Sequence, residues 1–329
     1  MSRKITITSQ GFPLRVPFRI SRGTKTVADV VTVAISDMGQ VGRGECVPYP
    51  RYGESVEDTI EAIESVQQAL SKGVSRMDLL ELMPAGAARN AVDCALWDLE
   101  MRLTGENVAT SLGLPQPLPP VATALTIGLD TPERMAMAAQ ELTSVPLIKV
   151  KVDRHDPSAQ LIAVRQAAPN PRMIVDPNES WSIHEVEALQ DLMLDLRVDL
   201  LEQPLPTKED DDLRGFVSAI PIAADESIHV ADDLEQLPDG YSVVNIKLDK
   251  AGGLTAALEL ERAARQRGLD IMTGCMVCTS LSIAPALMIA ARSCFVDLDG
   301  PLWLSQDRES GISIDQGTLF APKRGFWGG

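Results

Sequence analysis

Charged residues recur at nearly even intervals along the second half of this chain, each at the end of a short apolar run. The apolar runs are PLIKVKV, RMIVD, VDLLE, IPIAAD and SVVNIK. From Lys151 onward the charges are 25, 26, 23 and 22 residues apart, close to the ~30 residues of a β–α–β unit. Consecutive parallel strands would therefore present these charges at one end of a barrel. The residues are Lys149, Lys151, Asp176, Glu202, Asp225 and Lys247.

Three of these charges are carboxylates that follow apolar strands: Asp176, Glu202 and Asp225. Oxygen ligands of this hardness suit Mg²⁺, which leaves further positions for water or substrate. Any one of them could instead cap the helix that follows it, but three in succession favour a metal site. Asp225 and Glu226 are adjacent, so we expect only one of them to face inward, and the strand register favours Asp225.

The lysines flank this carboxylate set. Lys149 and Lys151 lie two residues apart, so both point to one face of their strand; the alternative is a solvated basic strand end. Lys247 ends a later strand and would face Lys151 across the metal. A base on each side of one carbon permits removal of a proton from one face and its return to the other. Such a lysine needs a pKa lowered by desolvation and neighbouring cations.

The last apolar run ends in FVDLDGP, which places Asp297 and Asp299 two residues apart. Such a carboxylate pair suits a cationic group such as a substrate ammonium, although a surface turn before Gly300 would give the same spacing. Cys275 and Cys278 form one C-x-x-C. Without a second pair this is a weak signal for zinc or redox chemistry, so we expect this segment to line the substrate site.

The chain divides into two patterns that would position these side chains. Residues 1–50 read as strands, and 54–72 and 86–104 have helical spacing. After the Pro-rich stretch at 112–120 the pattern alternates between strand and helix. Eight strands of this kind fit an α/β barrel whose last helix is absent. The expected strands are near 121–127, 147–152, 172–176, 198–202, 221–225, 243–247, 270–274 and 294–298, with helices at 132–142, 156–168, 183–195 and 254–267.

Composition excludes several other classes of protein. The net charge of −16 argues against nucleic acid and anionic membranes as partners. Five scattered cysteines do not form a disulfide framework. The first residues lack the apolar core of a signal peptide, and the apolar stretch at 281–291 is too short to span a bilayer. We therefore expect a soluble cytoplasmic protein, which leaves open whether it forms a homo-oligomer.

LIKVKVD, IVDPNESW, LLEQPLP, IAADES, VNIKLDKAGGLT and FVDLDGP together resemble the enolase superfamily, within its muconate-lactonising subgroup. The last motif makes the chain similar to the dipeptide epimerases. The resemblance extends to PYPRYGES and PAGAARNAVDCALWDLE in the first part of the chain. It implies a modified TIM barrel, (β/α)7β, at 119–299 and an N-terminal α+β capping domain at 1–118, with the tail 300–329 packing back on that domain.

The resemblance also implies roles for individual residues. Mg²⁺ would bind Asp176, Glu202 and Asp225, and Lys151 and Lys247 would be the opposed acid and base. Contacts to the substrate would come from other residues. Lys149 would lie beside the substrate carboxylate, the acidic pair would hold the ammonium, and the loop around Arg22 and Lys25 would select an acidic side chain. The implied substrate-binding residues are Thr126, Lys149, Cys275, Val277, Asp297, Asp299, Arg22 and Lys25.

The reaction implied is Mg²⁺-dependent epimerisation of a dipeptide at its C-terminal residue, from L-Ala-L-Glu to L-Ala-D-Glu, through a metal-stabilised enediolate. The setting implied by resemblance is murein-peptide metabolism. o-Succinylbenzoate synthesis and cycloisomerisation are alternatives from the same subgroup, but their substrates carry no ammonium for Asp297 and Asp299. A non-catalytic small-molecule binding protein is the alternative from a different class.

Overall fold

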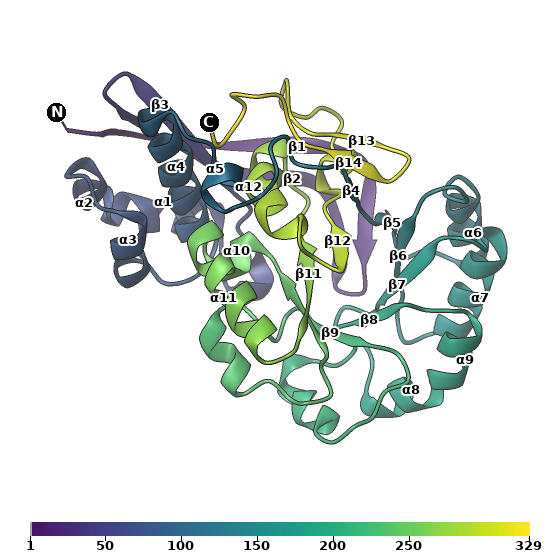
Figure 1. Ribbon diagram of the computed structural model, residues 1–329. Coiled ribbons are helices and arrows are strands. Elements are labelled where there is room, and N and C mark those ends of the chain that lie inside the picture. The colour runs from purple at the N-terminus through teal and green to yellow at the C-terminus, as the bar shows by residue number, and fades with distance from the viewer. Residues whose placement is uncertain (1) are drawn as a thin grey trace.

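The computed structural model describes residues 2–329, which begin with a three-stranded antiparallel sheet in the order β1-β2-β3. Its strands are β1 (Lys4–Ile20), β2 (Gly23–Asp37) and β3 (Gln40–Cys46). Helices α1 (Val56–Ser65), α2 (Gln67–Ser71), α3 (Arg76–Leu82), α4 (Ala87–Thr104) and α5 (Val108–Ser111) follow. The helical segment expected at 54–72 is divided at Val66, whose ψ of 3° departs from helical geometry. Figure 1 shows this part of the chain beside the barrel.

Helix α4 packs on β3 at very short range because two strand residues are glycines. A Cβ at Gly42 would lie 2.2 Å from the backbone oxygen of Ala95, and one at Gly44 would lie 2.1 Å from that of Ala91. Small residues on the helix and glycines on the strand therefore match one another. This contact fixes the capping sheet against its longest helix.

Eight parallel strands then form one sheet in chain order from β5 to β12. Its edges meet where Ala124 N donates to Val296 O at 2.8 Å, so the sheet closes into a barrel. A buried apolar cluster fills the interior, with one side chain from each strand or its first flanking residue, as expected for a barrel whose centre is a packed core. The strands are β5 (Leu125–Ile127), β6 (Leu147–Lys151), β7 (Arg172–Asp176), β8 (Leu200–Glu202), β9 (Ile222–Ala224), β10 (Val243–Ile246), β11 (Asp270–Gly274) and β12 (Phe295–Asp297).

The connections depart from the expected pattern in three places. The helix expected at 183–195 is two helices that meet at Leu189. The connections after β8 and β9 contain 3₁₀ turns in place of α-helices, η2 (Thr207–Leu213) and η3 (Ala231–Glu235). The α-helices around the barrel are α6 (Pro132–Gln140), α7 (Pro157–Ala167), α8 (Ile183–Ala188), α9 (Gln190–Asp195), α10 (Leu248–Ala251), α11 (Leu254–Gln266) and α12 (Ser280–Ala290).

The strand expected at 121–127 is also divided. β4 (Val121–Ala122) pairs with β14 (Thr318–Phe320), which pairs with β13 (Ser313–Asp315), so only β5 belongs to the barrel. The last residues reach the first sheet and its helices, since Trp327 Nε1 donates to Cys94 O at 3.1 Å. The (β/α)7β barrel with a separate N-terminal antiparallel sheet confirms the predicted fold class.

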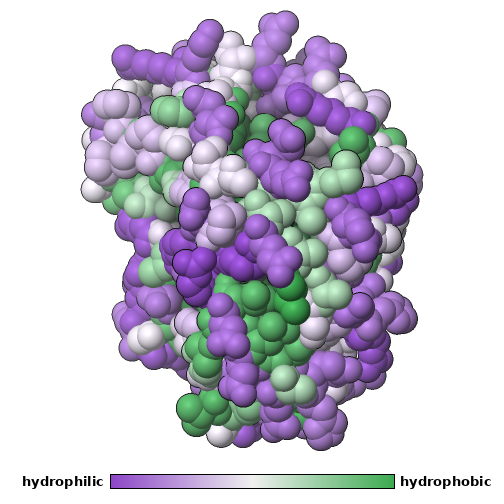
Figure 2. All heavy atoms as spheres, turned by 90° about the vertical axis from the view of Figure 1, so that its right-hand side faces the viewer, coloured by the Kyte–Doolittle hydropathy of each residue, from purple (hydrophilic) through white to green (hydrophobic). Residues whose placement is uncertain are grey.

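On the face of the barrel that carries α6, α7 and α9, hydrophilic side chains surround a smaller hydrophobic patch (Figure 2). Met137 of α6 and Leu194 of α9 are among the exposed apolar side chains. Within residues 2–329, no helix combines the length and the apolar character needed to cross a membrane.

Candidate active site

A cavity of about 460 Å³ lies between the capping sheet and the carboxyl ends of the barrel strands. Its capping wall comes from the turn between β1 and β2 and from η1 (Pro50–Tyr52). Ten of the residues predicted to act on or bind substrate line it together. They are Arg22, Lys25, Thr126, Lys149, Lys151, Lys247, Cys275, Val277, Asp297 and Asp299.

The three predicted metal ligands lie next to this cavity without lining it. Asp176 ends β7, Glu202 ends β8 and Asp225 follows β9, and all three are buried. Lys149 Nζ lies 3.0 Å from Asp176 Oδ2 and 2.7 Å from Glu202 Oε2. The carboxylates therefore share one buried region with a lysine ammonium between them.

The three carboxylates supply the hard oxygen donors that a divalent cation prefers, and a lysine ammonium lies between them in the structure. Burial, followed by the charge of Asp176, raises the pKa of Glu202 to about 8, because the buried carboxylates repel one another. Glu202 Oε2 accepts no hydrogen bond of good geometry, although Lys149 Nζ lies 2.7 Å away as an ion-pair partner. Within residues 2–329, no three Asp, Glu, His or Cys side chains converge closely enough to enclose an ion. The positive charge that faces these carboxylates in the structure is supplied by lysine.

Lys151 and Lys247 reach the cavity from opposite sides of the barrel. Lys151 is on β6 and Lys247 follows β10, which are four strands apart in a closed ring of eight. Lys151 Nζ lies 2.5 Å from Asp176 Oδ2, and Lys247 Nζ lies 2.6 Å from Asp225 Oδ2. The arrangement places one amine on each side of a bound molecule.

The pKa of Lys247 differs from the sequence-based prediction. Burial is the largest influence and lowers the pKa of this amine, but the carboxylates of Asp225, Glu202 and Glu226 together outweigh it, so the net pKa is raised. The prediction of a lowered pKa counted desolvation and neighbouring cations and left out this 2.6 Å contact. A divalent cation bound to Asp225 would partly neutralise this carboxylate and would therefore lower the pKa of Lys247.

The acidic pair lies at the end of β12. Asp297 Oδ2 accepts from Lys149 Nζ at 2.8 Å, while its Oδ1 has no donor. Asp299 accepts from the backbone N–H of Thr126 at 2.8 Å. Burial, followed by the charge of Asp297, raises the pKa of Asp299 to about 7. A cation bound here would relieve the repulsion between the two carboxylates.

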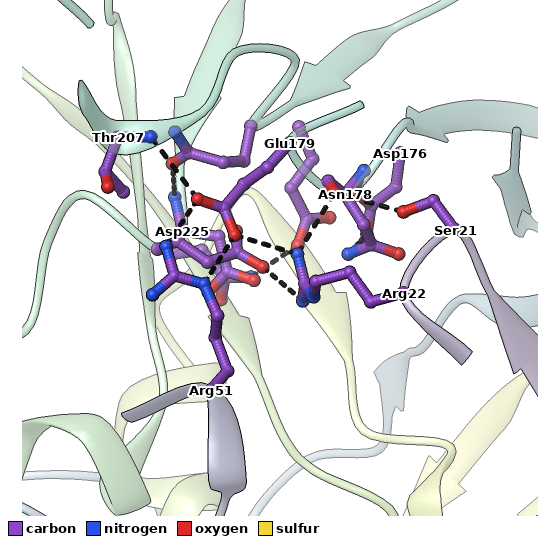
Figure 3. A network of polar contacts seen from close by, with 12 residues as sticks. Ser21, Arg22, Arg51, Asp176, Asn178, Glu179, Thr207 and Asp225 are labelled. Atoms are coloured by element: carbon purple, nitrogen blue, oxygen red, sulfur yellow. Dashed lines mark hydrogen bonds and ion pairs between the residues drawn. The ribbon is translucent and has the colours of Figure 1, made fainter. Parts of the chain in front are cut away.

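Arg22 and Lys25 differ in how their charges are balanced. Arg22 donates to Glu179 at 3.0 Å (Figure 3). It also donates to Glu226 at 2.7 Å. Lys25 Nζ lies 4.7 Å from the centre of the Tyr49 ring, and no carboxylate of residues 2–329 forms an ion pair with it. Burial lowers the pKa of Lys25. Of the two, Lys25 has the positive charge available to a ligand.

Sequence reasoning missed part of this site. The prediction that only Asp225 would face inward is wrong, because Glu226 is also buried and lines the cavity. Strand alternation does not apply there, since β9 ends at Ala224. Lys250 was also missed, although it lies one helical turn after Lys247, a spacing that places both on one side. Its Nζ donates to the backbone oxygen of Asp225 and, at 2.7 Å, to the carboxylate.

Comparison with known families covers nearly the whole chain. Residues 2–113 match the mandelate racemase / muconate lactonizing enzyme N-terminal domain. Residues 133–325 match the enolase C-terminal domain-like family.

Individual relatives are similar over their full length. The L-Ala-D/L-Glu epimerase of Escherichia coli K12 is 45% identical over 96% of this chain and 99% of its own. The N-acetyl-D-glutamate racemase of a Pseudoalteromonas species is 41% identical over 91% of this chain and 95% of its own. A crystal structure from Agrobacterium tumefaciens, of an enolase family member with homology to dipeptide epimerases, has sodium and L-Ala-L-Glu bound. It superimposes with a TM-score of 0.96 at 45% identity, over 99% of this chain and 100% of that one. Because both of its domains match, this chain belongs to the mandelate racemase / muconate lactonizing enzyme family of the enolase superfamily.

Proposed function

We propose that this chain is a Mg²⁺-dependent dipeptide epimerase that inverts the C-terminal residue of L-Ala-L-Glu. The observation that carries the proposal is the placement of Lys151 and Lys247 on opposite sides of one cavity, with a carboxylate pair on its wall. The name of the E. coli relative and the dipeptide in the A. tumefaciens structure support the same substrate class.

Proton transfer is assigned to the two lysines. One Nζ removes the proton from Cα of the C-terminal residue, and the other returns a proton to the opposite face. The two lysine side chains are only 8% and 11% exposed, so bulk water has little access to the reacting carbon. Asp176, Glu202 and Asp225 would hold the divalent cation, which supplies positive charge toward the substrate carboxylate and so favours loss of the α-proton.

The remaining side chains orient the dipeptide. Lys149 lies beside the metal ligands and is placed to attract the substrate carboxylate. Asp297 and Asp299 are assigned to the N-terminal ammonium of the substrate. Its positive charge would offset the repulsion between the two carboxylates. Thr126 fixes Asp299 through its backbone N–H. Lys25 is the group assigned to an acidic side chain, because its charge has no ion-pair partner within residues 2–329.

Racemisation of an N-acylated glutamate is a second candidate. The Pseudoalteromonas relative of that name is 41% identical. Such a substrate has no ammonium, so a carboxylate pair would have to accept an amide in its place. Asp299, with a pKa raised to about 7, is partly protonated at neutral pH and could donate to an acyl oxygen.

Proton NMR in D₂O with Mg²⁺ separates these candidates. The panel is L-Ala-L-Glu, L-Ala-L-Phe, L-Ala-L-Lys and N-acetyl-L-glutamate. Loss of the Glu α-proton signal together with appearance of L-Ala-D-Glu would support the proposal. Exchange in N-acetylglutamate alone would favour the second candidate, and exchange in neither would contradict both.

Single lysine variants test the mechanism. We expect Lys151→Ala and Lys247→Ala each to abolish epimerisation, with α-proton exchange surviving for one isomer at most. Lys208→Ala is the matched control, because Lys208 is an exposed lysine away from the cavity. Normal epimerisation by both single variants would contradict the two-base scheme.

A further inference from the structure

Glu179 stands at the junction between the barrel and the capping segments that cover the cavity. It lies three residues after Asp176, in the loop that follows β7. Asn178 and Glu179 have backbone φ angles of 48° and 64°, a left-handed conformation that residues other than glycine rarely adopt. Two consecutive residues in this conformation persist only where the surroundings hold them. The contacts of the Glu179 side chain supply that support.

The Glu179 carboxylate accepts from two arginines on separate capping segments. Arg51 Nε donates to Oε2 at 2.8 Å and Arg51 Nη2 donates to Oε1 at 2.6 Å, which is a bidentate pair. Arg22 Nη1 donates to Oε2 at 3.0 Å. Thr207 N donates to Oε1 at 3.3 Å from the loop after β8. Figure 3 shows Arg22 and Arg51 converging on Glu179 from two sides.

The segment that carries Arg22 has further bonds to the barrel. Ser21 Oγ donates to Asn178 O at 3.1 Å, Arg22 Nη1 donates to the same oxygen at 3.0 Å, and Arg22 Nη2 donates to Glu226 at 2.7 Å. Residues of this segment and of η1 form one wall of the cavity. Glu179 itself does not line the cavity. Its influence on a bound ligand is therefore indirect, and its side-chain bonds lead to the two capping segments.

We propose that Glu179 is a positioning residue that joins two capping segments, residues 18–25 and 49–53, so that they close over the cavity together. The side chain of Glu179 is only 7% exposed, so its bonds to Arg22 and Arg51 are less screened than those of a surface ion pair. Arg22 and Arg51 both donate to this one carboxylate. An uncharged side chain at position 179 could not accept both hydrogen bonds from Arg51.

The coupling has a specific kinetic consequence, which rests on the proposed epimerase function. If the closed arrangement binds substrate, the apparent affinity falls in proportion to the fraction of molecules that are closed. Substrate at saturation restores closure. A variant that weakens the junction should therefore raise KM and leave kcat nearly unchanged, whereas general damage to the site would lower kcat.

The kinetic experiment compares Glu179→Gln with wild-type enzyme on L-Ala-L-Glu. We expect KM to rise roughly tenfold, which corresponds to a closed fraction of about one tenth, and kcat to stay within about twofold. Arg51→Lys keeps the charge and loses the bidentate geometry, so it should give an intermediate KM. The double variant Glu179→Gln/Arg51→Gln should have a KM no higher than that of Glu179→Gln alone, because both changes break the same contact. Arg214→Gln is the matched control, since Arg214 pairs with Asp211 on the exposed surface.

Hydrogen–deuterium exchange of the substrate-free protein tests the junction without any catalytic readout. Glu179→Gln should speed amide exchange in residues 18–25 and 49–53 together, and Arg214→Gln should change neither segment. If wild-type protein epimerises no dipeptide, the proposed function fails while this measurement still decides the coupling. Faster exchange in one segment only, or an unchanged KM in Glu179→Gln, would overturn the proposal.

Discussion

Glu45 connects three distant parts of the chain, and removal of its charged partner should be costly. Glu45 lies on β3 and is almost fully buried. Arg308 donates to its Oε2 through Nη2 at 2.6 Å and through Nε at 2.9 Å. Thr279 donates through its backbone N–H at 3.0 Å and its hydroxyl at 2.6 Å, and Ser282 donates through its hydroxyl at 2.9 Å. These contacts tie the capping sheet to the tail and to the start of α12.

Arg308→Met would leave the Glu45 carboxylate buried with only neutral donors. Removing one partner of a buried ion pair typically costs ~3–5 kcal/mol of unfolding free energy. Arg308 is 22% exposed and Glu45 keeps three neutral donors, so we expect the lower end, about 3 kcal/mol. The variant Glu45→Gln with Arg308→Met should cost less than the sum of the two single changes, with a coupling of about 2 kcal/mol.

Urea unfolding of the four proteins in this double-mutant cycle measures these differences, provided the slopes of the transitions agree. Arg324→Met is the matched control, because Arg324 is an exposed arginine in the same tail. Glu45 also holds the residues that follow the cavity-lining Cys275 and Val277, so KM for the dipeptide should rise in Arg308→Met. A loss below about 1 kcal/mol, or strict additivity in the cycle, would refute the reasoning.

Three further predictions follow from single features of the structure. Burial raises the pKa of Asp93 to about 6 from 3.8, so the contribution of its protonated form to stability is present below pH 4 and is lost as pH rises to about 6. The unfolding free energy of Asp93→Asn, measured by urea titration, should therefore rise by about 3 kcal/mol relative to that of wild type over this pH range. Gly44→Ala places a Cβ 2.1 Å from Ala91 O and should lower the unfolding free energy by at least ~1–3 kcal/mol in a urea titration. Chelation of divalent cations should abolish α-proton exchange by NMR, and Mg²⁺ at a hundredfold excess over its dissociation constant should restore it and stabilise the fold by about 2.7 kcal/mol.

The barrel could be predicted from the sequence because most of its strands are short apolar runs with a charged residue at or just after their carboxyl ends. The runs that end in Asp176 and Glu202 match β7 and β8 at their carboxyl ends. The turn that carries Arg22 and the run that ends in Asp297 line the same cavity, while their roles in binding stay predictions. Local pattern sufficed there, because a strand end fixes the direction of a side chain in this fold.

The pairing of charges could not be predicted in the same way. Glu179 and Arg51 are separated by 128 residues, and Glu45 and Arg308 by 263. No periodic pattern links residues so far apart. In the sequence, each of these residues by itself has the features of an ordinary surface charge. The raised pKa of Lys247 has the same origin, since it depends on Asp225, Glu202 and Glu226, which come close to this amine only in the closed barrel.

The net charge of the residues that line the cavity is opposite in sign to that of the whole protein. The chain has a net charge of −16, yet six cations and three carboxylates line the cavity. Charges farther away than about 8 Å are largely screened at physiological ionic strength, so the lining residues dominate what a ligand meets. Two of the three carboxylates, Asp297 and Asp299, lie together at the end of β12, and Arg22, Lys25 and Arg51 line the capping wall. A cavity that offers both signs of charge favours a zwitterion over a simple anion, and Lys25, which has no ion-pair partner within residues 2–329, adds a place for a second carboxylate. This distribution of charge favours L-Ala-L-Glu over a neutral dipeptide, and replacing Lys25 by Met should reduce that preference in a competition between L-Ala-L-Glu and L-Ala-L-Phe.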